Sequence, residues 1–118
     1  MPTPAHRRYP RIPAQHVVMV RAQGRHPLEE FARTRTLGLG GCMFVSEEPL
    51  GHGTPLDLAI AVAGRVVRTE SRVVYEHVQG RFAHEVGVEF VDLSHADRRF
   101  LETVLAERLE PPAGAIQP

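Results

Sequence analysis

The 118-residue sequence contains one cysteine, Cys42, and no lysine. A single cysteine excludes an internal disulfide and leaves no set of thiolates for a metal centre, so Cys42 is expected in the core beside Met43 and Phe44. No apolar run is long enough for a transmembrane helix, and the N-terminus has no apolar signal-peptide segment. We therefore expect a cytoplasmic protein that does not insert into a membrane.

The sequence also lacks a net charge, because fourteen arginines balance fourteen acidic residues. Nucleic-acid-binding domains usually carry a strong positive charge, so neither DNA nor RNA is an expected partner. The charges are unevenly distributed, however, since the first 35 residues hold seven arginines and only two acids, Glu29 and Glu30. Arginine suits bidentate contacts with phosphate or a guanine edge, although a GC-rich genome would produce the same bias.

The length favours one domain, and no internal repeat is visible. The first sixteen residues, MPTPAHRRYPRIPAQH, contain four prolines and three arginines. Because proline fixes φ and removes a backbone donor, residues 1–16 are predicted to be a flexible basic arm that is neither helix nor strand. Residues 17–110 are predicted to form the domain, and residues 111–118 a disordered tail.

Alternating apolar residues predict about six short strands in the central part of the chain. These strands are expected at Val17–Arg21, FARTRT, CMFV, LDLAIAV, RVVRTESRVVYEHV and FAHEVGVEF. The segment GRHPLEE is predicted to be a turn, as is the region around Gly80. The residues expected to face the core are Leu56, Leu58, Ile60 and Val62 in one strand, and Phe82, Val86, Val88 and Phe90 in another.

The apolar period changes to that of a helix in DLSHADRRFLETVLAERLE. The apolar positions at helical spacing are Leu101, Val104, Leu105 and Leu109. Ser94 and Asp97 form a candidate capping box, and Pro111 and Pro112 are expected to end the helix. The predicted fold is a small antiparallel β-barrel, since closure removes exposed strand edges, with the helix capping or flanking it.

Three glycines, Gly38, Gly40 and Gly41, lie in TRTLGLGGCMFV between two strand-like runs. They could form a phosphate-binding loop, a tight hairpin turn, or a binding turn whose polar residues have been replaced. Phosphate-binding glycine loops lead into a helix N-terminus, whose free N–H groups hold the anion. A strand-like run follows here, and no Gly-Lys-Ser/Thr sequence is present, so we do not expect a nucleotide P-loop.

The other polar residues form no recognisable catalytic or metal-binding pattern. The seven histidines are scattered, with no pair at metal-ligand spacing. Ser46, His52 and Asp57 could form a triad on paper, but no nucleophile-elbow sequence surrounds the serine. His84 has the parity of inward-facing residues and is expected to be hydrogen-bonded or exposed at the barrel rim. We predict no enzyme, no metal and no cofactor.

The segment RRYPR places Arg7 and Arg11 four positions apart, with Arg8 between them. A mobile pair of arginines can close over an anionic ligand, because guanidinium groups pair with phosphates and stack on flat bases. A solvated basic tail would have the same composition. The segment alone therefore leaves both interpretations open.

Together, the two segments resemble the PilZ domain family, bacterial receptor modules for cyclic di-GMP. Family members pair an R-x-x-x-R arm with a [D/N]-x-S-x-x-G turn between barrel strands. Arg7 and Arg11 match the arm, and TLGLGG, Thr36 to Gly41, aligns with the turn. The similarity continues through CMFVSEEPLGHGTPLDLAI and SRVVYE to HEVGVEFVDLSHADRRFLETVL, covering roughly residues 6–109. It implies a six-stranded antiparallel β-barrel with a C-terminal helix, in agreement with the elements predicted above.

Two positions depart from the family's turn motif. Thr36 stands where the family has Asp or Asn, and Gly38 stands where it has Ser, side chains that face the guanine edge of the ligand. Losing such hydrogen bonds, at roughly 1–3 kcal/mol each, would weaken binding about five- to 150-fold per contact. The resemblance implies a weakened cyclic di-GMP site formed by Arg7, Arg8, Arg11, Thr36, Gly38, Gly40 and Gly41. The alternative is a divergent PilZ-like adaptor that binds no nucleotide and acts through protein–protein contacts.

Three further expectations accompany the resemblance. Gly40 and Gly41 are expected to allow a positive φ or a close backbone approach. Because no output domain is recognised, the signal should pass to an unidentified effector protein that controls motility or exopolysaccharide synthesis. Whether the protein forms a homodimer is left undecided by the sequence, since the apolar stripe of the helix could pack on its own barrel or on a neighbour.

Overall fold

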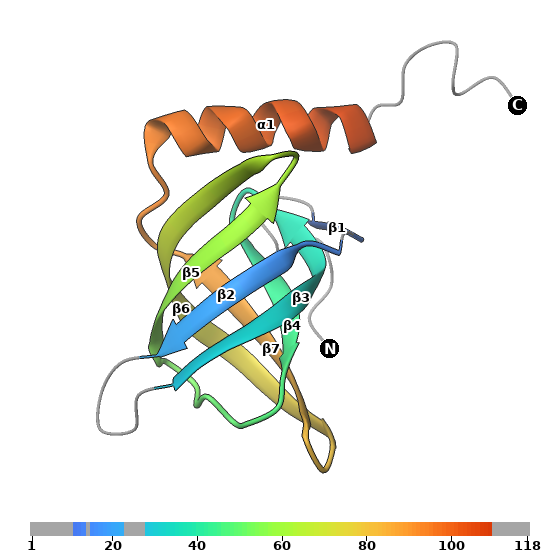
Figure 1. The fold of residues 1–118 in the computed structure, drawn as a ribbon, viewed down its shortest axis with the longest axis vertical. Helices are drawn as coiled ribbons and strands as arrows, with labels where there is room; N and C mark the ends of the chain where they lie inside the picture. Colours follow the sequence, from blue (N-terminus) through green and yellow to red (C-terminus); the bar gives the residue numbers. More distant parts are fainter. Residues whose placement is uncertain (1–10, 14, 23–27, 110–118) are drawn as a thin grey trace, which may run out of the picture.

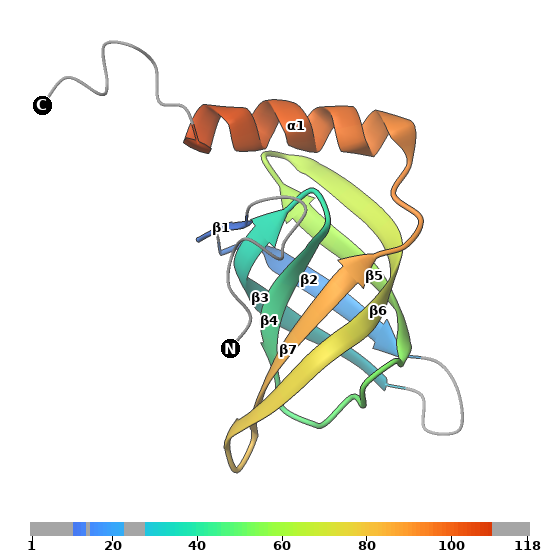
Figure 2. The same ribbon diagram turned by 180° about the vertical axis from the view of Figure 1, so that it is seen from behind.

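The structure, a computed structural model, describes residues 11–13, 15–22 and 28–109, which form seven strands and one helix (Figures 1 and 2). The elements are β1 (Arg11–Pro13), β2 (Val17–Ala22), β3 (Leu28–Gly38), β4 (Gly41–Ser46), β5 (Pro55–Val62), β6 (Arg65–Gly80), β7 (Ala83–Phe90) and α1 (His95–Leu109). The strands wrap into a barrel, and α1 lies across one end of it.

Six of the strands close the barrel. The pairing order is β3–β2–β5–β6–β7–β4, and β4 pairs with β3 to complete the ring, with every pair antiparallel. The predicted six-stranded antiparallel barrel with a C-terminal helix is therefore confirmed. Strand β1 pairs with the last three residues of β3. Strand β2 pairs with the first part of β3, residues 28–33, along the same edge, so β1 continues the line of β2.

Three local predictions are wrong. Arg11–Pro13 was expected to be neither helix nor strand, but it forms β1 because β3 offers it a free edge. Of the segment predicted as a turn, GRHPLEE, the last three residues belong to β3, which cross-strand pairing with β2 extends back to Leu28, and residues 24–27 lie outside the described residues. Phe82 lies in the turn between β6 and β7 and is 70% exposed, so it does not face the core. The turn predicted around Gly80 is confirmed.

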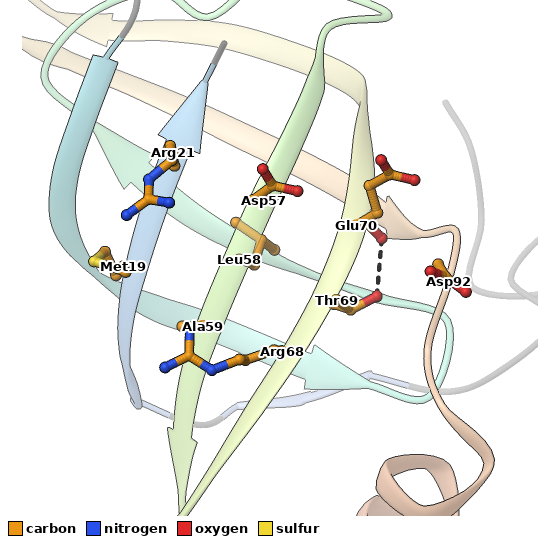
Figure 3. A pocket seen from close by; sticks show the side chains of 9 residues that line it. All are labelled: Met19, Arg21, Asp57, Leu58, Ala59, Arg68, Thr69, Glu70 and Asp92. Atoms are coloured by element: carbon orange, nitrogen blue, oxygen red, sulfur yellow. Dashed lines mark hydrogen bonds between the residues drawn. The ribbon is translucent and has the colours of Figure 1, made fainter.

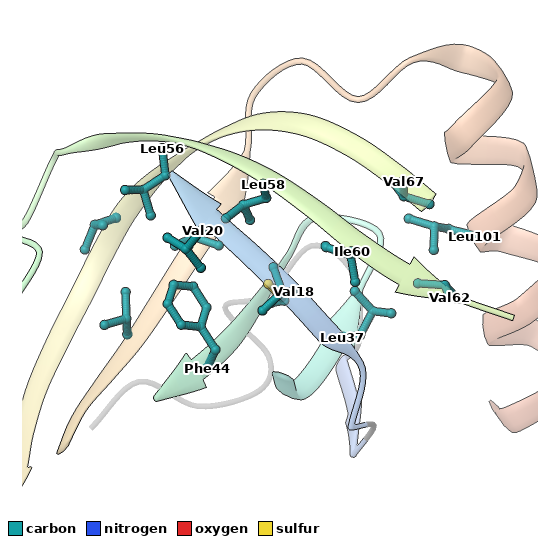
Figure 4. Packing of buried hydrophobic residues seen from close by; sticks show 14 of the residues in the cluster. Val18, Val20, Leu37, Phe44, Leu56, Leu58, Ile60, Val62, Val67 and Leu101 are labelled. Atoms are coloured by element: carbon teal, nitrogen blue, oxygen red, sulfur yellow. The ribbon is translucent and has the colours of Figure 1, made fainter. Parts of the chain in front are cut away.

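The core fills the barrel interior. The predicted inward residues of β5 are all buried, as are Val86 and Val88 of β7, and Phe90 packs partly against them. Cys42 and Phe44 of β4 are also fully buried, as expected. At the helix end, Leu101 joins the same cluster beside Val62 and Val67 (Figure 4). The apolar stripe of the helix therefore packs on its own barrel.

The start of α1 is capped as predicted. The backbone N–H of Asp97 donates to Ser94 Oγ at 3.0 Å, and the N–H of Arg98 donates to the Ser94 carbonyl at 2.8 Å. The Asp97 carboxylate bonds Arg65 at 2.8 Å, and that guanidinium lies 4.8 Å from the centroid of the Phe100 ring. Since Arg65 begins β6, these contacts fix the helix to the β5–β6 hairpin.

Candidate functional site

Strand β1 brings two parts of the predicted site together. Its Cα register pairs Arg11 with Gly38 and Pro13 with Thr36. The end of the arginine segment therefore lies directly beside the glycine turn, although the two are more than twenty residues apart in sequence. Arg7 and Arg8, the other two arginines predicted for the site, lie outside the described residues.

A β-bulge at Arg35 sets which residues of β3 face outward. Thr34 pairs with Phe44, whereas Thr36 pairs with Met43, so Arg35 is the extra residue. Thr34 and Leu37 are fully buried toward the core. Because a strand alternates its faces, an unbulged strand would also have turned Thr36 inward. The bulge therefore places Thr36, and Gly38 two residues later, on the outer face.

The glycine turn is tight and attached to β7. Gly38 ends β3 and Gly41 begins β4, and both are buried. The Gly40 carbonyl accepts a hydrogen bond from the Phe90 N–H at 2.8 Å. Of the two alternatives expected for Gly40 and Gly41, a positive φ is not found, because the positive φ values among the described residues occur in the loops around residues 51–53 and 63–64. The close backbone approach stays a prediction.

The hydroxyl of Thr36 is unusual for this outer face. The residue is half-buried, yet its Oγ1 is shielded from solvent and has no hydrogen-bond partner among the residues that the structure describes. A buried hydroxyl without a partner costs free energy, and such groups are uncommon in folded proteins. Thr36, which the sequence resemblance aligns with the Asp or Asn of the family's turn motif, therefore carries an unused hydrogen-bonding group.

Sequence reasoning missed one residue of this surface, Tyr75. The outer row that starts at Thr36 continues across β4, β7 and β6 through Met43, Gly87 and Tyr75. A Cβ atom added at Gly87 would lie 2.0 Å from Tyr75 Cε2, so the tyrosine ring lies directly on the glycine backbone. An isolated glycine inside a strand pattern, as in HEVGVEF, often marks such a close approach.

Replacing Gly87 with alanine is expected to lower the free energy of unfolding by about 1–3 kcal/mol, because the new methyl group displaces the Tyr75 ring. In a Tyr75→Ser background, the same substitution should be neutral or stabilise by about 0.5–1 kcal/mol, because alanine is the better strand residue. Urea denaturation of the four proteins in this double-mutant cycle measures the coupling. Equal costs in both backgrounds would contradict the contact.

Two other polar residues considered in the sequence, Ser46 and His84, lie at neighbouring positions of β4 and β7. Ser46 is buried, and its hydroxyl lies within hydrogen-bonding distance of two acceptors, the Glu30 carboxylate and, at 2.8 Å, the Glu48 carbonyl. His84 is half-buried, and its Nδ1 has no hydrogen-bond partner in the described ranges. Within those same ranges, no group of three or more His, Cys, Asp or Glu residues is arranged to hold a metal, and no helix could span a membrane.

The fold and this surface define a class of protein, namely a six-stranded β-barrel with a C-terminal helix and an N-terminal strand beside the β3–β4 turn. The family model described as "PilZ domain" matches residues 5–107. The chain therefore belongs to the PilZ domain family, and the resemblance found in the sequence is confirmed. No relative among curated proteins is matched at a significant level.

Solved structures with the same fold are similar at low sequence identity. The motility inhibitor MotI/DgrA of Bacillus subtilis aligns over 90% of this chain with 19% identity and a TM-score of 0.71. MrkH of K. pneumonia, solved as a c-di-GMP complex, aligns over 88% with 17% identity and a TM-score of 0.71. The chain spans 53% and 52% of these two proteins, respectively.

A structure of an isolated PilZ domain overlaps over nearly its whole length. The PilZ domain of YcgR from Escherichia coli, solved with c-di-GMP, aligns over 91% of this chain and 99% of its own length. The identity is 17% and the TM-score is 0.60. These likenesses establish the fold of the chain.

Proposed function

We propose that this protein is a non-enzymatic cyclic di-GMP receptor whose binding surface is formed by β1, the β3–β4 turn and the outer row that ends at Tyr75. The observation that carries the proposal is the pairing of Arg11 with Gly38, which joins the two segments that resemble the family's receptor motifs. The family match and the ligand in the MrkH and YcgR structures support the same ligand.

Each part of the surface has a distinct role in this proposal. Arg7, Arg8 and Arg11 pair with the ligand's phosphates and stack on its bases. Gly38, Gly40 and Gly41 bring bare backbone close to the ligand. Thr36 contributes its unpaired hydroxyl, and the Tyr75 ring offers a stacking face, since aromatic rings bind nucleobases by stacking.

A second candidate function is a PilZ adaptor that binds no nucleotide. The identities of Thr36 and Gly38 favour it, because a threonine hydroxyl carries no charge and glycine offers no side chain to a guanine edge. Such a protein would act through protein contacts alone. The two functions predict opposite results in a nucleotide titration.

Under the receptor proposal, the Arg7→Ala/Arg11→Ala variant should lose binding by at least 100-fold, because phosphate contacts supply much of the affinity for such ligands. The measurement is equilibrium dialysis with labelled cyclic di-GMP, with linear pGpG as competitor. The matched control is Arg81→Ala/Arg99→Ala, which removes two exposed arginines from the β6–β7 turn and from α1. The control should bind like the wild type.

Two outcomes would contradict the receptor proposal. Equal losses in both double variants would mean that binding reflects overall charge rather than the arginine arm. Absence of wild-type binding at high micromolar ligand would favour the nucleotide-free adaptor. Thermal unfolding without ligand, compared between the two variants, checks that neither change acts through folding.

Under this proposal, ligand capture orders the arm against the barrel, and a separate effector protein reads the new surface. The named motility inhibitor among the similar structures is consistent with an output in motility, and exopolysaccharide synthesis is the other expected pathway. Under the same proposal, the receptor would work in the cytoplasm.

A further inference from the structure

The outer surface of the barrel opposite the row from Thr36 to Tyr75 carries an unusual set of apolar residues. Figure 1 faces this side, with β2 and β5 in front, whereas Figure 2 faces β4 and β7. The apolar face consists of Phe31 on β3, Val17 and Met19 on β2, Ala59 and Ala61 on β5, and Val66 on β6. The outer face of a small barrel is normally polar, so this face requires an explanation.

The register places these residues in two adjacent rows. One row runs from Phe31 through Met19 and Ala59 to Arg68. The next row begins at exposed Arg33, which pairs with Val17, and it ends at Ala61 paired with Val66. Phe31 is 73% exposed, and Val66 is 51% exposed. Exposed apolar side chains gathered on neighbouring strands mark an interaction site more often than scattered single residues do.

A depression of about 380 Å³ adjoins the apolar face, and both acidic and basic side chains line it (Figure 3). Asp57, Glu70 and Asp92 line it together with two arginines, Arg21 and Arg68. Arg21 is already paired at 2.7 Å with Glu29, which lies opposite it on the neighbouring strand β3. Around the depression, therefore, negative charge exceeds positive charge.

Two of the carboxylates are available to a partner. Within the part of the chain that the structure describes, Glu70 and Asp92 have no ion-pair partner, and Asp92 is exposed. Their charge would repel nucleic acid and anionic lipid headgroups and would attract arginine or lysine. The surface thus combines an apolar platform with an acidic edge.

We propose that this apolar face and its acidic edge bind an amphipathic helix of a partner protein, with apolar anchors flanked by basic residues. Strands lie about 4.8 Å apart, so the platform from β3 to β6 is about 14 Å wide. Helical anchors at positions i, i+3 or i+4, and i+7 span about 10.5 Å, which fits this width. Phe31, Met19 and Val66 contact the anchors, while Glu70 and Asp92 pair with the basic flank.

The test uses two synthetic 18-residue peptides with leucines at the same helical spacing, one with arginine and the other with glutamate at the flanking positions. Each peptide is titrated into ¹⁵N-labelled protein without nucleotide, so the outcome is independent of the receptor proposal. The arginine peptide should give saturable shifts on β2, β5 and β6, and the glutamate peptide should bind at least tenfold more weakly.

Variants separate the two parts of the surface. Phe31→Ser/Val66→Thr should lower the affinity for the arginine peptide at least tenfold, and Glu70→Gln/Asp92→Asn should lower it about three- to tenfold. The matched control is Phe82→Ser, which removes a phenylalanine of equal exposure from the β6–β7 turn and should change nothing. All of the substituted side chains are largely exposed or at strand surfaces, so the variants should fold.

Three results would overturn the proposal. The first is the absence of saturable binding. The second is equal binding of the two peptides by the wild type, or equal binding of the arginine peptide by the wild type and the Phe31→Ser/Val66→Thr variant. The third is a concentration-dependent dimer, seen by analytical ultracentrifugation, that this double variant dissociates, because the face would then be occupied by a second copy of the chain.

Discussion

Replacing Phe44 with alanine is expected to lower the free energy of unfolding by about 3–5 kcal/mol, because the substitution leaves a cavity in the centre of the barrel. Phe44 is completely buried on β4, opposite Val86 on β7 and Thr34 on β3. A loss of this size is a large fraction of the stability of an ordinary domain. Urea denaturation followed by circular dichroism measures it.

Phe31→Ala is the matched control, since it makes the same chemical change on the outside of the same barrel. Because its side chain is 73% exposed, Phe31→Ala should change the free energy of unfolding by no more than about 0.5 kcal/mol. A cost below about 1 kcal/mol for Phe44→Ala, or similar costs for the two substitutions, would contradict the inward and outward assignment of these strands.

The double substitution Thr36→Asp/Gly38→Ser should tighten cyclic di-GMP binding, because it restores the side chains that the family carries at these positions. Each regained buried hydrogen bond is worth roughly 1–3 kcal/mol, or about five- to 150-fold in affinity. Isothermal titration of the variant and the wild type under identical salt conditions measures the change. Thr36→Asn, which restores an acceptor without the charge, should give part of the gain.

The same variant should be less stable than the wild type when no ligand is present. The site of Thr36 Oγ1 is shielded from solvent, so a carboxylate there is desolvated unless an arginine pairs with it. Added cyclic di-GMP should therefore raise the melting temperature of the variant more than that of the wild type. Affinity unchanged in both variants would mean that the turn does not contact the guanine bases.

The strands and the helix could be predicted where one periodicity continued without interruption. In β5, each of Leu56, Leu58 and Ile60 faces the core, and these large apolar residues alternate with Asp57 and with small alanines on the outer face. The start of α1 was predictable for a different reason, since Ser94 satisfies backbone N–H groups of the first turn locally.

The errors arose where distant pairing decides local structure. The three residues of β1 include Pro13 and have no strand pattern of their own, and they become a strand only because β3 is beside them. Glu29 and Glu30 favour a solvated turn in isolation, but Glu29 pairs with Arg21 across β2 and β3. Phe82 was assigned by continuing the alternation of β7 past its first residue, into the turn.

The candidate site was predictable in its motifs and not in its geometry. The resemblance identified Arg11 and the turn from Thr36 to Gly41, but a bulge has no reliable sequence signal, so the outward direction of Thr36 required the structure. Tyr75 joins the surface through three successive strand pairings, which one sequence does not reveal.

The most direct test of the account is a titration of ¹⁵N-labelled wild-type protein with cyclic di-GMP, followed by amide chemical shifts. Saturable shifts at Arg11, Ile12 and 36–41, together with Tyr75 and Gly87, are the predicted result, with little change on β2 and β5. Absence of shifts at millimolar ligand, or shifts centred on the outer face of β2 and β5, would contradict a receptor surface formed by β1 and the β3–β4 turn.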